Sequence, residues 1–104
     1  MFLLIVYIPI DAVAQVKKAI FDAGAGNIGR YSQCCWQTQG TGQFMGEASA
    51  TPHIGKTQQL ESVDEIKVEC LCPEKAIDAI IDALIAAHPY ETPAFAYWPV
   101  KTHA

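Results

Sequence analysis

The segment from Phe2 to Ile8 has no charged or strongly polar residue at any position. Alternate side chains of a β-strand point to opposite faces of the sheet. Each face of this strand would therefore be apolar, with Phe2, Leu4, Val6 and Ile8 on one side and Leu3, Ile5 and Tyr7 on the other. No Lys or Arg precedes the run and Pro9 ends it, so we expect a strand and not a signal peptide. Both faces of such a strand must be shielded from water by other parts of the protein or by another chain.

The remaining segments alternate between helical and extended patterns. Residues 11–24 carry Val13, Val16 and Ile20 at helical spacing, and the clearest helix opens at Pro73 and stops at His88-Pro89. Its apolar stripe has the i, i+3, i+4, i+7, i+8 spacing and comprises Ile77, Ile80, Ile81, Leu84 and Ile85. We expect further strands over residues 31–45, loosened at Gly40-Thr41-Gly42, over residues 65–70 and over residues 94–100, and a long loop over residues 46–63.

The resulting order is β-α-β-β-α-β. This order predicts one α+β domain over residues 1–104, a ferredoxin-like sandwich in which two helices cover one face of an antiparallel sheet. The other face would expose the second apolar side of the first strand together with aromatic residues of the last strand. We therefore expect copies of the chain to associate through the open face of the sheet.

Composition excludes several classes of partner. The chain has 104 residues, of which 51% are hydrophobic and 17% charged, with 7 Lys and Arg against 11 Asp and Glu. A net charge of −4 leaves no basic surface for nucleic acid or anionic lipid, and no apolar run reaches the roughly 20 residues of a membrane span. The apolar core does not depend on disulfides, so we expect a cytoplasmic protein with reduced thiols.

Two motifs could bind a ligand but have structural interpretations that we favour. Residues 24–29 match the G-x-G-x-x-G pattern of dinucleotide-binding proteins, but here the pattern follows a helix and leads into a strand, which indicates a helix C-terminal turn. Cys34-Cys35 and Cys70-x-Cys72 lie on segments expected to be neighbouring strands, where thiolates could hold a soft metal. Packing as small buried hydrophobes is the interpretation that we favour for them.

The bend from His88 to Pro93 and His53 in the long loop are the strongest candidates for a site. Two prolines restrict the bend, so Tyr90 and Glu91 would have a defined orientation. His53, His88 and Glu91 could bind a divalent cation or act as acid and base. A structural interpretation remains open, in which His88 contacts the last helix carbonyls and Glu91 accepts backbone amides.

Four ordered motifs resemble one known family. They are residues 24–32, residues 40–44, residues 52–55 and the His88 to Pro93 bend. They are similar to the domain inserted in the dinuclear-metal-centre hexameric family, also labelled GTP cyclohydrolase I type 2-like, which includes the bacterial YqfO proteins. The resemblance covers nearly all of residues 1–100 and implies a fold like that of the PII and CutA trimers. His53 stands where the resemblance leads us to expect Phe.

The resemblance limits which activity we expect. The family's two-metal site is built from His, Asp and Glu residues of flanking domains that these 104 residues do not include, so we do not expect its hydrolase label to transfer. We expect a non-enzymatic, homo-oligomeric regulatory or sensor module, a trimer, that binds a small ligand or a divalent transition metal at clefts between subunits, with a protein partner downstream. The ligand-binding residues would be His53, Tyr90 and Glu91, and the metal ligands His53, His88 and Glu91. The alternatives are a metal-dependent hydrolase or cyclohydrolase and a purely structural partner domain.

Overall fold

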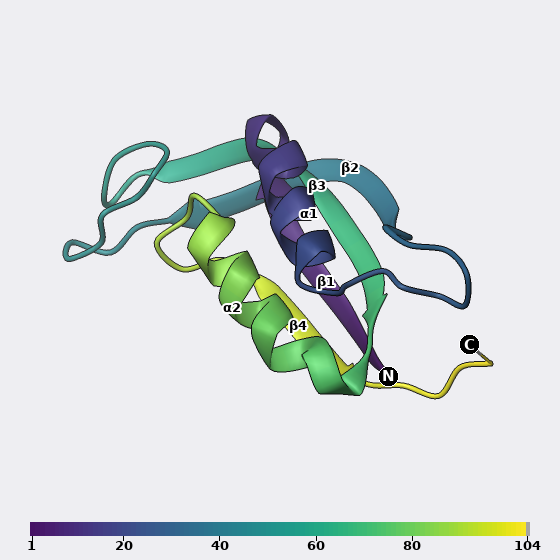
Figure 1. Ribbon diagram of the computed structural model, residues 1–104. Helices are drawn as coiled ribbons and strands as arrows, with labels where there is room; N and C mark the ends of the chain where they lie inside the picture. The colour runs from purple at the N-terminus through teal and green to yellow at the C-terminus, as the bar shows by residue number, and fades with distance from the viewer. Residues whose placement is uncertain (104) are drawn as a thin grey trace.

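A computed structural model describes residues 1–103 and contains one four-stranded sheet and two α-helices (Figure 1). A short 3-10 turn precedes each helix. The order along the chain is the predicted β-α-β-β-α-β. In sequence, the elements are β1 (Phe2–Pro9), α1 (Val13–Asp22), β2 (Trp36–Met45), β3 (Leu60–Cys72), α2 (Ile77–Ala87) and β4 (Phe95–Pro99).

The sheet has the strand order β2-β3-β1-β4, and every neighbouring pair is antiparallel. Both helices lie on the same face of this sheet, which confirms the predicted ferredoxin-like sandwich (Figure 1). The crossovers through α1 and α2 place β1 between β3 and β4, so the most apolar strand is central. A central strand has no free edge and is the natural place for side chains that must leave water.

The two faces of β1 differ in burial as expected. Leu4, Val6 and Ile8 are fully buried beneath the helices, where they meet the apolar stripes of α1 and α2. Leu3, Ile5 and Tyr7 alternate with them, point to the open face and are only half-buried. In register with Leu3 lie Leu71 of β3 and Trp98 of β4, and Trp98 is 42% exposed. The open face of an isolated chain is therefore apolar at its centre.

The β2–β3 hairpin differs from our prediction in its limits. Strand β2 starts at Trp36, not Tyr31, and continues without interruption through Gly40-Thr41-Gly42, while β3 already starts at Leu60. Glycine supplies the same backbone hydrogen bonds as any other residue, so pairing with β3 holds these positions in the strand. The loop is thus residues 46–59. The hairpin extends beyond the helices, and the chain measures 46 × 24 × 22 Å (Figure 1).

The glycine motif at residues 24–29 forms the turn after α1, as predicted. Gly24 and Gly26 have φ values of +115° and +79°, which L side chains rarely adopt. The Gly26 amide donates to the Leu71 carbonyl, and its own carbonyl accepts from the Cys34 amide. A Cβ at Gly26 would lie 2.8 Å from the Cys34 backbone. The motif therefore serves backbone packing, and the dinucleotide interpretation is wrong in this context.

Two further properties of the described residues are the burial of the cysteines and the length of the helices. All four cysteines are free, with Cys70 and Cys72 buried on β3 and Cys34 and Cys35 half-buried. Donation of a hydrogen bond from the Cys70 thiol to the Cys72 side chain, and then burial, raise the pKa of the Cys70 thiol. Within residues 1–103, neither helix is long and apolar enough to cross a bilayer.

Candidate functional site

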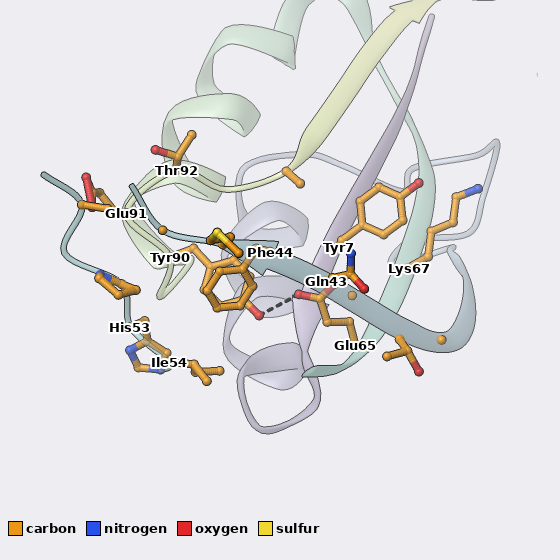
Figure 2. A pocket seen from close by; sticks show the side chains of 18 of the residues that line it. Tyr7, Gln43, Phe44, His53, Ile54, Glu65, Lys67, Tyr90, Glu91 and Thr92 are labelled. Atoms are coloured by element: carbon orange, nitrogen blue, oxygen red, sulfur yellow. Dashed lines mark hydrogen bonds between the residues drawn. The ribbon is translucent and has the colours of Figure 1, made fainter. Parts of the chain in front are cut away.

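A pocket of about 700 Å³ lies beside the open face of the sheet (Figure 2). Its floor is formed by β2 and by side chains of β1 and β3, and its rim by the 46–59 loop and the bend after α2. A volume of this size is within the usual range for small-molecule sites, roughly 300–1,000 Å³. The pocket lining includes the aromatic or charged side chains of Tyr7, Phe44, His53, Glu65, Lys67, Tyr90 and Glu91.

Tyr90 is at the centre of this pocket and connects its walls. Its ring centroid lies 6.2 Å from that of Phe44 in β2 and 6.4 Å from that of His53 in the loop. Its hydroxyl donates a hydrogen bond of 2.6 Å to Oε2 of Glu65 in β3 (Figure 2). Burial, and then the bond to Glu65, raise the pKa of Tyr90. The phenol therefore stays protonated and remains a donor to Glu65.

His88 holds the bend that carries Tyr90. His88 is 6% exposed, and its Nδ1 accepts a 3.1 Å hydrogen bond from the Tyr90 amide. Nε2 therefore carries the proton and donates to the Tyr7 carbonyl at 2.7 Å. Burial lowers the pKa of His88, so the neutral ring is the favoured form. His88 thereby ties the bend to the central strand and positions Tyr90 over the pocket floor.

Glu91 ties the bend to the loop. Its Oε1 accepts 2.6 and 2.9 Å hydrogen bonds from the amide and the hydroxyl of Thr51. These two bonds, the amide first, lower the pKa of the Glu91 carboxyl, so it stays ionised near neutral pH. The carboxylate is at the surface, and the contact joins residues 40 positions apart. It restrains the rim of the pocket.

Replacing Glu91→Ala is expected to release the loop. The Thr51 amide loses its acceptor, so its hydrogen exchange should accelerate about tenfold in an amide-resolved NMR measurement. Glu47→Ala is the matched control, because the Glu47 side chain lies in the same loop and makes no hydrogen bond within residues 1–103. An unchanged exchange rate in Glu91→Ala would show that other contacts hold the loop.

The predicted site residues separate into two groups. His53, Tyr90 and Glu91, the predicted ligand-binding residues, all line the pocket. The predicted metal ligands His53, His88 and Glu91 are not brought together, and no group of three or more His, Cys, Asp or Glu within residues 1–103 could hold a metal ion. The reason is that both nitrogens of His88 bond the backbone and Glu91 bonds Thr51. The predicted metal set therefore stays a prediction, and the described residues do not assemble it.

Sequence reasoning missed Glu65 and the role of the glycines in β2. Glu65 lies across the face of β2, and a Cβ on Gly42 would overlap its carboxylate, whereas a Cβ on Gly40 would meet open space. Glycine inside a strand often marks the close approach of another group. The Gly40-x-Gly42 spacing was therefore the available signal, and it indicates an opening in the sheet surface, not a break in the strand.

The chain is similar to part of several curated proteins. It is 48% identical over 91 residues to the GTP cyclohydrolase 1 type 2 homolog of Mycobacterium leprae, which covers 88% of this chain and 24% of that protein. It is 41% identical over 98 residues to the homolog from Bacillus subtilis, covering 94% of this chain and 26% of that protein. The chain thus spans about a quarter of the length of these relatives. No family model matches it.

Solved structures give the same result for the fold. The Bacillus cereus protein related to NIF3 superposes with a TM-score of 0.82 at 35% identity, over 97% of this chain and 26% of that one. CutA1 from Pyrococcus horikoshii superposes with a TM-score of 0.70 at 14% identity, over 100% of this chain and 87% of that one. The PII-like protein CutA from Nostoc gives 0.67 at 13% identity, over 96% and 81% of the two chains.

Proposed function

The chain is homologous to a segment of about a quarter of the GTP cyclohydrolase 1 type 2 homologs, the inserted CutA-like domain, and from this premise we propose that it is a non-enzymatic regulatory module that binds a small organic ligand. The observation that carries the proposal is the pocket of about 700 Å³. Four parts of the chain, β1, the β2–β3 hairpin, the 46–59 loop and the bend, contribute side chains to it. Convergence of distant segments on one concave surface is typical of ligand sites.

Ligand binding would act through the loop. The loop contributes His53 to the pocket and is attached to the bend through Thr51 and Glu91. A ligand that contacts His53 and Tyr90 together would favour the attached state of the loop over the released one. The loop surface would then differ between free and bound protein, which is what a downstream protein partner could recognise.

The hydrolase alternative receives less support from this geometry. A catalytic metal needs about three protein ligands and an open position. Of the three candidate ligands, His88 and Glu91 bond other groups of the protein, and no set of three or more His, Cys, Asp or Glu that could hold a metal ion is found in residues 1–103. We therefore propose binding without chemistry, and an organic molecule in preference to a bare metal ion.

We further propose that the pocket borders a contact between copies of the chain. Tyr7 and Lys67 belong both to the pocket and to the open face of the sheet. The same face carries Leu3, Leu71 and Trp98. A second copy that covers this apolar centre would reach the pocket, and the homotrimer predicted from the sequence would contain three equivalent clefts of this kind.

A thermal-shift screen of water-soluble metabolites, with Zn²⁺, Cu²⁺ and Ni²⁺ as separate arms, tests the proposed function. Gly40→Leu should fill the pocket without disturbing the strand, because the position opens into space. We expect at least one organic compound to raise the melting temperature of the wild type by about 2 °C or more at a saturating concentration and to leave Gly40→Leu unaffected. Thr57→Leu, at a loop position outside the pocket lining, is the control.

The outcomes separate the alternatives. A compound that shifts the wild type and Thr57→Leu but not Gly40→Leu supports binding in the pocket. If only a metal ion shifts the wild type, or if every active compound also shifts Gly40→Leu equally, the proposed ligand site is wrong. Turnover of a compound in the screen, detected by mass spectrometry, would contradict the non-enzymatic role.

A further inference from the structure

The polar atoms at the centre of the pocket are acceptors of hydrogen bonds. The Tyr90 hydroxyl gives its only proton to Oε2 of Glu65, so its oxygen can offer only lone pairs to a ligand. The second oxygen of Glu65, Oε1, faces Gly42 and takes part in no hydrogen bond within residues 1–103. A molecule in contact with both oxygens must therefore bring its own donors.

The charges of the pocket favour a cation. Its lining includes the carboxylates of Glu47, Glu65 and Glu91 and one cationic side chain, Lys67. Nζ of Lys67 lies 3.6 Å from Oε1 of Glu69, outside the lining, so its charge is partly balanced by that neighbour. An anionic ligand would be attracted only by the Lys67 amine, which also interacts with Glu69, and would be repelled by three carboxylates. A positively charged one would find an excess of negative charge.

The walls favour an organic cation over a hydrated ion. The rings of Phe44 and His53 lie beside the ring of Tyr90, whose hydroxyl oxygen is one of the acceptor atoms (Figure 2). Aromatic faces attract cations through their quadrupole, and the effect is largest for weakly hydrated groups such as guanidinium and alkylammonium. The same rings bury the apolar body of an organic ligand, which a small inorganic cation cannot use.

We propose that the pocket selects a small organic cation whose N–H groups bond Glu65 Oε1 and the Tyr90 oxygen while its apolar or planar body packs against the rings of Phe44 and His53. This assignment rests on the proposed ligand-binding function and names the chemical class of its ligand. Glu65 supplies the charge that selects the cation, and Gly42 leaves the space that Glu65 occupies. Tyr90 places its oxygen next to that carboxylate because Glu65 and the bend at His88 both hold it.

Three probes with one carbon skeleton test the charge preference. Benzamidine is a planar cation near neutral pH, benzamide is its neutral counterpart, and benzoate its anion. Titrations of the isotopically labelled full chain, followed by NMR, should show shifts at Gly42, Phe44 and Glu65. We expect benzamidine to bind about tenfold more tightly than benzamide, as one charge-assisted hydrogen bond allows, and benzoate to bind least.

The isosteric variant Glu65→Gln identifies the selecting group. It keeps an oxygen that can accept from Tyr90, so the fold should persist, but it removes the charge. The preference for benzamidine should fall from about tenfold to less than about threefold. Glu74→Gln, in the turn before α2 and outside the pocket lining, is the control and should keep the full preference.

Each result decides the assignment. Equal or tighter binding of benzamide or benzoate at the same residues would overturn the cation class while leaving a ligand site in place. An unchanged preference in Glu65→Gln would overturn the role of Glu65. If none of the three probes shifts pocket residues at millimolar concentration, the assignment is also wrong, and the metabolite screen with Gly40→Leu then decides separately whether the pocket binds any ligand.

Discussion

The variant Leu3→Lys is expected to reduce the mass of the particle in solution about threefold. Light scattering should give about three times the 11.3 kDa chain mass for the wild type and 11.3 kDa for the variant, both at micromolar concentration. Leu3 lies at the centre of the open face, between Leu71 and Trp98. A lysine buried there against a second copy would have no carboxylate in register and would cost several kcal/mol per subunit.

The same variant should preserve the fold of each chain. Leu3 is only half-buried in the monomer, so a lysine can extend its amine into water. Ile85→Lys is the matched control, since Ile85 is 51% exposed on α2, on the opposite side of the sheet. It should keep the wild-type mass. A wild-type mass of 11.3 kDa, or an unchanged mass for Leu3→Lys with wild-type circular dichroism, would rule out association through the open face.

The success of the fold prediction and its errors have the same physical origin. The order of elements followed from side-chain periodicity, since the stripe from Ile77 to Ile85 and the two-sided apolarity of β1 each allow one kind of burial. The limits of β2 did not follow, because β2 is exposed along most of its length and carries little burial signal. Its conformation depends on backbone pairing with β3. The glycines at positions 40 and 42 permit this pairing, but the side-chain pattern of β2 does not predict it.

The sequence predicted only the part of the site in which prolines restrict the backbone. The prolines at positions 89 and 93 identified the bend, and with it Tyr90 and Glu91. The partners of the bend lie far away in sequence, at Thr51 and Glu65, and no short motif connects them to it. His88 had the composition of a metal ligand, but the residues that decide its role are the backbone groups of Tyr7 and Tyr90, which have no sequence signature.

His88→Phe is expected to lower the free energy of unfolding by about 2–4 kcal/mol at pH 7.5. Phenylalanine keeps the ring volume but leaves the Tyr7 carbonyl without its donor and the Tyr90 amide without its acceptor. Each unsatisfied buried backbone group costs about 1–3 kcal/mol. Urea denaturation measures the change. His53→Phe makes the same substitution at an exposed position and should change stability by less than about 0.5 kcal/mol.

The pH dependence of stability tests whether the His88 ring is neutral in the folded protein. Burial lowers its folded pKa below the ordinary 6.5, although the Tyr7 carbonyl and Glu65 oppose this and His53 adds to it. The neutral ring's contribution is therefore complete above about pH 6.5 and decreases as the pH falls, because the unfolded chain takes up a proton first. Between pH 7.5 and 5.5, unfolding free energy should fall more for the wild type and His53→Phe than for His88→Phe. Equal losses in all three would mean that folding leaves the pKa of His88 unchanged, so that its burial does not favour the neutral ring.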